Sequence, residues 1–237
     1  MFNTNFSLYG IMLVISLISN VIVVLCVYKK YNLTRDEVIG ALVYENIGII
    51  IGAKFLTYLE NLNIYINFDF LNIGLTSYGA LLGAFICLFI FKIQFKKKSK
   101  DIYYTFLPSI PLMYAIGKIG CFLVGCCYGM EYSGPGNIIY NYSSTAPKNI
   151  SLFPVQILET IIFTLIFIYT IKKTIKNKFN NKELGIFLTL CGTAKFLLDF
   201  LRMKTTSNIF SINQVLSLIF IFIGIFIFMK YLKEEND

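Results

Sequence analysis

Charged side chains stand inside long apolar stretches of this sequence, where they are costly to keep. A charged group at the centre of a membrane span costs roughly 3 kcal/mol unless it is paired or hydrated, so each one marks a candidate functional position. At similar depth in their spans these residues are Lys54, Lys118, Glu159, Lys195, Asp199 and Arg202, while Glu45 lies deeper and stands apart. The four cations outnumber the two carboxylates. The excess predicts an anionic ligand, and the phosphate of a lipid head group is the first candidate.

Three of these charges are spaced to meet on one helix. Lys195 and Asp199 are four residues apart, and Asp199 and Arg202 are three apart, which are the spacings of neighbours on a helix face. The sequence therefore predicts that they pair with one another. The alternative interpretation is that they only neutralise each other, since a buried ion pair often adds nothing to stability.

Three of the six cysteines lie close together in the sequence, while Cys26, Cys87 and Cys191 are scattered. Cys121, Cys126 and Cys127 are open to four interpretations: packing residues, a disulfide, a metal site or an acyl-accepting thiol. Packing is favoured, because cysteine is commonly a small buried hydrophobe. Neither a metal nor a cofactor is expected, because the spacing C-x4-C-C lacks the paired pattern of zinc motifs and the chain has no histidine.

The elements that must position these residues are membrane helices. Hydrophobic residues make up 57% of the chain and charged residues 14%, against about 25% charged in a soluble domain. Apolar runs of about 20 residues recur along the whole length. The sequence predicts an all-α integral membrane protein with seven transmembrane helices, at about 5–28, 38–58, 73–95, 103–126, 152–171, 184–202 and 210–231. The first run lacks a small-residue cleavage site, so we expect a retained helix.

The distribution of basic residues predicts the orientation of these helices. Basic residues follow the first, third and fifth spans, as Lys29, Lys30 and Arg35, then Lys92 to Lys100, then Lys172 to Lys182. Cytoplasmic loops carry such an excess, so we expect the N-terminus outside and the C-terminus in the cytoplasm. The net charge of +8 then reflects orientation, and no nucleic-acid partner is expected. Residues 1–237 are predicted to form a single transmembrane domain with an outer loop at about 127–151.

The polar residues of different spans fall at similar depth. Counting about 1.5 Å per residue from each helix end places the cations in the middle or outer half of their spans. The neighbours expected at that depth are Tyr78, Gln156, Glu159, Asn213 and Gln214. We therefore expect a hydrated cavity that opens toward the outer leaflet. A transporter is less favoured, because the two halves of the chain show no matching pair of discontinuous helices.

A glycine-rich segment ends the fourth span. Residues 117–129 read G-K-I-G-C-F-L-V-G-C-C-Y-G. This segment resembles the signature of prolipoprotein diacylglyceryl transferases, G-R-x-G-N-F-x-N-x-E-x-x-G. Lys118 stands at the arginine of that signature, Cys121 at an asparagine and Cys126 at the glutamate.

Shorter motifs similar to those of the same family follow its order along nearly the whole chain. They are Y-G-I-M at 9–12, G-A-K at 52–54, Y-G-A-L-L-G at 78–83, F-P-V-Q-I-L-E at 153–159, K-F-L-L-D-F-L-R at 195–202 and S-I-N-Q-V-L-S at 211–217. The family's histidine, a proposed catalytic base, corresponds to Tyr78. Its seven helices and outside N-terminus match the spans expected here.

The resemblance implies transfer of the diacylglyceryl group of phosphatidylglycerol to a cysteine thiol of a secreted preprotein, in the bacterial cell membrane. The catalytic residues it implies are Tyr78, Lys118, Glu159 and Lys195. Lys118 and Lys195, with Arg202 as a further candidate, would stabilise the phosphate, and Tyr78, Glu159 or a neighbouring lysine would help the thiol to ionise. The substrate-binding residues it implies are Tyr9, Lys54, Cys121, Cys126, Gln156, Asp199, Arg202 and Gln214. The alternative is a non-catalytic or differently specific paralogue that binds lipid or a lipidated partner.

Overall fold

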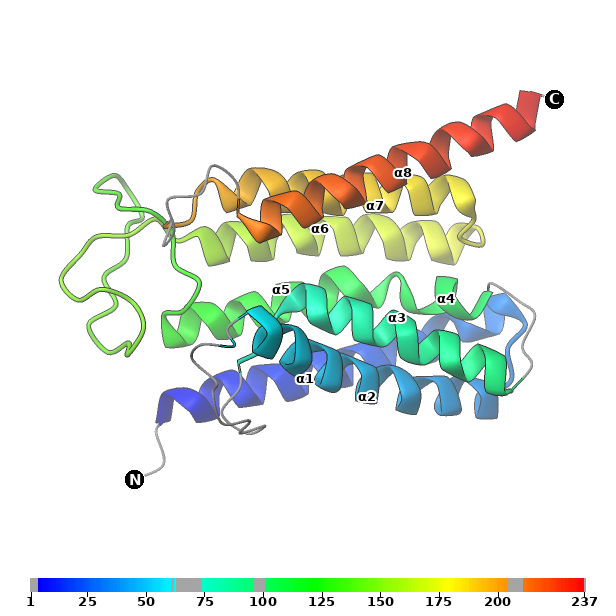
Figure 1. The fold of residues 1–237 in the computed structure, drawn as a ribbon, viewed down its shortest axis with the longest axis horizontal. Helices are drawn as coiled ribbons and strands as arrows, with labels where there is room; N and C mark the ends of the chain where they lie inside the picture. The colour runs from blue at the N-terminus through cyan, green and yellow to red at the C-terminus, as the bar shows by residue number, and fades with distance from the viewer. Residues whose placement is uncertain (1–3, 61, 63–73, 96–100, 204–210, 237) are drawn as a thin grey trace. The chain divides into compact units, whose positions relative to one another are not determined.

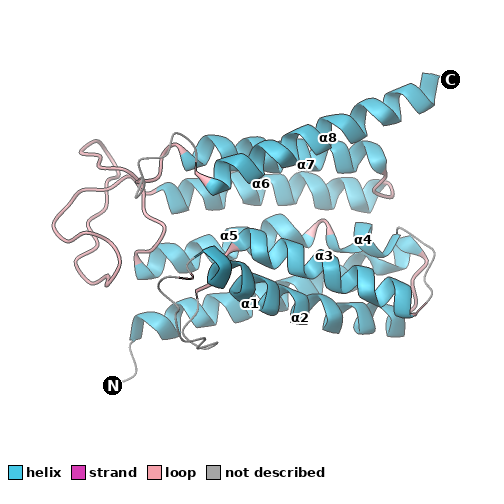
Figure 2. Cartoon of the chain, viewed as in Figure 1, coloured by secondary structure: helices cyan, strands magenta, loops and turns pink. Residues whose placement is uncertain are grey.

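The computed structural model describes residues 4–60, 62, 74–95, 101–203 and 211–236, and the secondary structure of these residues is helical apart from isolated β-bridges (Figures 1 and 2). The helices are α1 (Thr4–Val27), the short 3-10 helix η1 (Tyr28–Tyr31), α2 (Arg35–Glu60), α3 (Ser77–Gln94), α4 (Asp101–Phe106), α5 (Ser109–Val124), α6 (Val155–Lys176), α7 (Asn181–Asp199) and α8 (Ile212–Asn236).

Each of the seven expected spans coincides with helix, although residues 73 and 210, where two of them begin, lie outside the described residues. Six helical segments of the described residues are long and apolar enough to cross a membrane. The seventh, α7, is also long enough but contains Lys182, Glu183, Lys195 and Asp199. The prediction of an all-α, multi-pass membrane protein is confirmed, while the orientation stays a prediction.

The fourth span is not the continuous helix expected over 103–126. It is divided into α4 and α5, which are separated by Leu107 and Pro108. Proline has no backbone N–H to continue the helical hydrogen bonds, so a break at this point is expected on chemical grounds. At the other end α5 stops at Val124, because Gly125 takes a left-handed conformation with a φ of 72°. Cys126 therefore lies beyond the helix.

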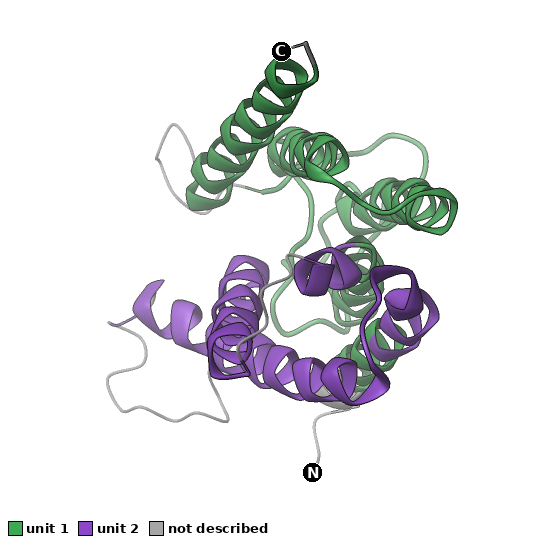
Figure 3. Cartoon of the chain, turned by 90° about the vertical axis from the view of Figure 1, so that its right-hand side faces the viewer, with its two compact units in different colours: residues 1–20, 108–237 green, residues 21–107 purple. Residues whose placement is uncertain are grey.

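The chain divides into two compact units, residues 1–20 with 108–237 as unit 1 and residues 21–107 as unit 2 (Figure 3). In unit 2, α2 and α3 approach through Gly48 and Gly52 on one helix and Gly79 and Gly83 on the other. A Cβ added to Gly83 would lie 2.0 Å from the carbonyl oxygen of Gly48, and one added to Gly52 would lie 2.4 Å from that of Gly79. Small residues four apart allow such backbone contact between membrane helices.

In unit 1, α6 packs against both α5 and α7, and α7 packs against α8. The hydroxyl of Thr160 on α6 donates to the carbonyl of Ala115 on α5 at 3.3 Å. The N-terminal part of α1 also packs on α5, where the hydroxyl of Ser16 donates to the carbonyl of Met113 at 3.2 Å. These contacts fix the helices that carry the polar residues of unit 1.

The loop between α5 and α6 is folded around its own small core. Tyr140 and Leu152 are fully buried in it, and Phe122 packs against them. An antiparallel β-bridge joins Gly129 to Arg202, just after α7, and Met130 N–H donates to the carbonyl of Leu201 at 2.9 Å. The loop is therefore attached to the end of α7.

We predict that Gly129→Ala destabilises unit 1. A Cβ at this position would lie 2.3 Å from the carbonyl oxygen of Phe153 and 3.1 Å from that of Leu201, and neither is a flexible side-chain end. We expect a loss of about 2 kcal/mol, measured as a lower midpoint of thermal unfolding in detergent. Gly117→Ala is the control, because a Cβ there meets nothing within 4 Å. Equal unfolding midpoints for the two variants would contradict the prediction.

Candidate active site

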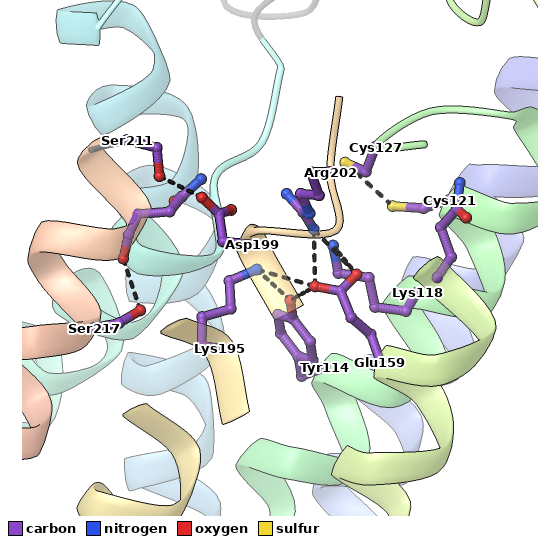
Figure 4. Close-up of polar contacts among 12 residues, drawn as sticks. Tyr114, Lys118, Cys121, Cys127, Glu159, Lys195, Asp199, Arg202, Ser211 and Ser217 are labelled. Atoms are coloured by element: carbon purple, nitrogen blue, oxygen red, sulfur yellow. Dashed lines mark hydrogen bonds and ion pairs between the residues drawn. The ribbon is translucent and has the colours of Figure 1, made fainter. Parts of the chain in front are cut away.

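Glu159 stands at the centre of a buried ion-pair cluster in unit 1 (Figure 4). Its carboxylate on α6 is fully buried and lies 3.0 Å from Lys118 Nζ on α5, 3.2 Å from Lys195 Nζ on α7 and 2.9 Å from a terminal guanidinium nitrogen of Arg202. That nitrogen of Arg202 also donates to the second carboxylate oxygen at 3.1 Å. One carboxylate thus joins three cations from three parts of the chain.

Tyr114 on α5 supports the same cluster. Its hydroxyl donates to Glu159 Oε1 at 2.7 Å and accepts a hydrogen bond from Lys195 Nζ. The ammonium groups of Lys195 and Lys118 also lie 4.9 and 5.1 Å from the centre of its ring, within the range of cation–π attraction. Tyr114 was not among the site residues predicted from the sequence. Its position one helical turn before Lys118 could have indicated that Tyr114 lies on the same helix face as the site.

The cluster carries an excess of positive charge. Lys118, Lys195 and Arg202 share the single carboxylate of Glu159, which leaves two formal positive charges. The side chains of the two lysines are each 8% exposed and that of Arg202 is 16% exposed. Arg202 Nε is buried and has no hydrogen-bond partner among the described residues. Buried cationic donors that exceed their counter-ions favour binding of an anion.

The spacing predicted that Asp199 pairs with Lys195 and Arg202, and this prediction is wrong. The carboxylate of Asp199 accepts a hydrogen bond from the hydroxyl of Ser211 instead. Arg202 is no longer on the same helix face because α7 ends at Asp199. Lys195 is still on α7, but its ammonium group pairs with Glu159 of α6 instead. Asp199 thereby connects the end of α7 to the start of α8.

Ser211 and Gln214 form a capping box at the start of α8. The backbone N–H of Gln214 donates to the Ser211 hydroxyl at 3.1 Å, and the Gln214 side chain accepts from the Ser211 N–H at 2.9 Å. This reciprocal pattern satisfies two backbone donors at a helix N-terminus. The Gln214 amide nitrogen is buried and has no hydrogen-bond partner among the described residues.

Three free thiols, those of Cys121, Cys126 and Cys127, lie close together, and Figure 4 shows Cys121 and Cys127 beside the ion-pair cluster. The sulfur atoms of Cys121, Cys126 and Cys127 are all within 4.8 Å of one another. Gln156 on α6 holds their segment in place, because its amide nitrogen donates to the carbonyl of Cys126 at 2.9 Å. Hydrogen bonds from the thiols of Cys121 and Cys126, together with the nearby charge of Lys118, hold the pKa of the Cys127 thiol well below its ordinary value.

The structure brings together most of the predicted site residues of unit 1. Tyr9, on α1, lies against Gly120 of α5, where an added Cβ would be 3.1 Å from the tyrosine ring. The other two predicted residues belong to unit 2. Tyr78 is 7% exposed in the first turn of α3, and Lys54 is half-buried on α2. The roles of all the predicted site residues, in both units, stay predictions.

Comparison with known proteins gives consistent matches over nearly the whole chain. The sequence model of the prolipoprotein diacylglyceryl transferase family matches residues 1–230. The phosphatidylglycerol–prolipoprotein diacylglyceryl transferase of Clostridium tetani is 31% identical over 229 residues, which cover 93% of this chain and 91% of the relative. The phosphatidylglycerol–prolipoprotein diacylglyceryl transferase 2 of Clostridium perfringens is 25% identical over 242 residues, which cover 97% of this chain and 94% of that protein.

We predict that Glu159→Gln destabilises the protein strongly. The variant leaves three buried cations without their counter-charge, and breaking a buried pair in this way costs about 3–5 kcal/mol. The midpoint of thermal unfolding in detergent measures the effect. Glu234→Gln is the matched control, because Glu234 is 59% exposed and lies 3.9 Å from an exposed Lys230, an arrangement that contributes less than about 1 kcal/mol. A Glu159 variant as stable as the Glu234 variant would show that the cluster does not depend on its carboxylate.

Proposed function

Since this chain belongs to the prolipoprotein diacylglyceryl transferase family, we propose that it transfers the diacylglyceryl group of phosphatidylglycerol to a cysteine thiol of a secreted preprotein. The reaction takes place in the bacterial cytoplasmic membrane, with the N-terminus of the chain outside and its C-terminus inside. The observation that supports this function most strongly is the excess of buried cations around Glu159.

The reaction needs those cations because it releases an anion. The acceptor sulfur forms a bond to the terminal glyceryl carbon, and the bond from that carbon to the phosphate oxygen breaks. The electron pair of the broken bond leaves with glycerol phosphate. Positive groups that are already in place where negative charge develops lower the barrier of such a step. Lys118, Lys195 and Arg202 supply these groups.

The three cations act in different ways. The ammonium groups of Lys118 and Lys195 are compact charges, whereas the guanidinium of Arg202 is planar and presents donors in fixed directions. Its unpartnered Nε offers one such donor to the phosphate. Glu159 already forms ion pairs with all three cations and accepts a hydrogen bond from Tyr114. We therefore assign Glu159 to positioning the cations, in preference to the role of base.

An apolar groove supports a lipid as the donor substrate. It has a volume of about 570 Å³ and lies between α6 and α7. Leu158, Leu198 and Leu201, which line it, are sequence neighbours of Glu159, Asp199 and Arg202. An acyl chain attached to a head group at the cluster would find apolar surface within reach.

A second candidate function is favoured by the departures from the family signature. The chain has no histidine, and cysteines occupy the signature positions of an asparagine and the glutamate. These changes fit a paralogue that binds lipid or a lipidated partner without catalysis. Complementation separates the two functions. Growth of a bacterium depleted of its own transferase, restored by this gene, would exclude the binding-only function.

We predict that Lys118→Ala and Lys195→Ala each lower the transfer rate about a hundredfold, the typical loss when one charge-stabilising donor is removed. The assay follows labelled diacylglyceryl from phosphatidylglycerol to a peptide with an acceptor cysteine. Lys118→Arg should retain activity, because arginine keeps the charge and can present two parallel N–H donors to a phosphate. Lys176→Ala, at the exposed end of α6, should have no effect.

Two outcomes of this assay would count against the proposals. Full activity of Lys118→Ala in correctly folded protein would exclude the phosphate-binding role of that lysine. No transfer by the wild-type protein, under conditions in which the Clostridium tetani relative is active, would exclude the transferase function itself.

A further inference from the structure

The three thiols beside the ion-pair cluster have the geometry of a metal site. The sulfur atoms of Cys121 and Cys127 are 3.9 Å apart, and all three sulfurs lie within 4.8 Å of one another. Zinc–thiolate bonds of about 2.3 Å at tetrahedral angles place two sulfurs about 3.8 Å apart. A disulfide requires a separation of about 2.05 Å, and it would use only two of the three thiols.

The backbone holds this arrangement without help from a bound ion. Gly125, at the end of α5, has a φ of 72°, and Cys127 has a φ of 53°. These two left-handed residues turn the chain so that Cys126 and Cys127 return toward Cys121 in the last turn of the helix. The amide of Gln156 then fixes the carbonyl of Cys126 at 2.9 Å. Ligands held in place in this way need little reorganisation to bind an ion.

We propose that Cys121, Cys126 and Cys127 bind a thiophilic divalent metal ion of the Zn²⁺ class, and that the fourth coordination position receives the acceptor thiol. The identity of this fourth ligand rests on the proposed function. The proposal reverses the sequence-based expectation of no metal, which compared the cysteine spacing with motifs of two pairs. Three protein ligands with one open position are the arrangement of catalytic zinc sites.

The surroundings of the thiols support an open and electrically balanced site. Cys121 is buried, Cys126 is half-buried and Cys127 has exposed surface, so Cys127 lies at the outer edge of the three-cysteine cluster. Three thiolates and a divalent ion leave one negative charge. Lys118 and Arg202 are electrostatic neighbours of Cys127 and compensate for it.

The metal would solve a chemical problem that the sequence poses. A thiol has a pKa of about 8.5 and must ionise to become a good nucleophile, and the chain has no histidine to serve as base. A thiol that coordinates a metal is deprotonated outright, and its proton passes to water. A lone pair of the bound sulfur then forms the carbon–sulfur bond as the carbon–oxygen bond to phosphate breaks. The metal keeps its oxidation state, and the thioether product binds it more weakly and leaves.

Cobalt(II) is the probe, because cobalt–thiolate bonds absorb light where the protein does not. The full chain, purified in detergent under reducing conditions, should bind about one Co²⁺ per chain, and Zn²⁺ should displace it. Cys121→Ser and Cys127→Ala should each weaken binding at least about tenfold, as the loss of a coordinating group does. Cys26→Ser, at an exposed position of α1, is the matched control and should bind as the wild type does.

The fourth position is tested by adding the acceptor peptide to the cobalt protein. A peptide with its cysteine should change the cobalt–thiolate absorption, and the same peptide with serine should not. Equal Co²⁺ affinity of the wild type and both cluster variants would overturn the metal site. A disulfide among the three cysteines in freshly purified protein would overturn it as well.

The metal site and the proposed function can fail separately. Transfer at the full wild-type rate after a chelator has removed all bound metal would overturn the coordination of the acceptor thiol by the metal and support the transferase function. A cobalt spectrum that responds to the cysteine peptide, in a protein that transfers nothing from phosphatidylglycerol, would support the metal site and overturn the transferase function.

Discussion

The carboxylate of Glu159 is the interaction on which the rest of unit 1 depends. It is fully buried and contacts cations from α5, from α7 and from the segment after α7. Without it, three positive charges would face one another in a medium that screens them poorly. Because its contacts come from separate helices, it also sets how those helices lie around the site. The same carboxylate thus satisfies a structural need and keeps two positive charges available for an anion.

Two residues of α6, one helical turn apart, hold different parts of the site. Gln156 holds the cysteine segment through the carbonyl of Cys126, and Glu159 holds the cations. Both belong to one short motif of the sequence, at 153–159, and they contact two others, at 117–129 and 195–202. These three motifs are therefore in direct contact in this protein. This explains why each is weak as a sequence pattern, since its residues act only together with those of the others.

The sequence predicted the helices and most of the charged residues of the site, because apolar length and buried charge are properties of single segments. It did not predict the partners. Helical spacing identifies neighbours only on one continuous helix, so the pairing of Lys195 with Glu159 and of Asp199 with Ser211 could not be read from it. The convergence of the three thiols depends on left-handed backbone at Gly125 and Cys127. Glycine hints at such a turn, but a cysteine does not.

The glycine contact between α2 and α3 has a consequence for how this gene can change. Nineteen lysines against two arginines are the usage that a gene rich in A and T would produce. Glycine codons begin with two G bases, and a change in either base introduces a side chain. At Gly48 and Gly83 that side chain would meet backbone at 2.3 and 2.0 Å. The first two bases of these codons are therefore constrained against change to A or T, even though Gly48 and Gly83 lie outside the ion-pair cluster.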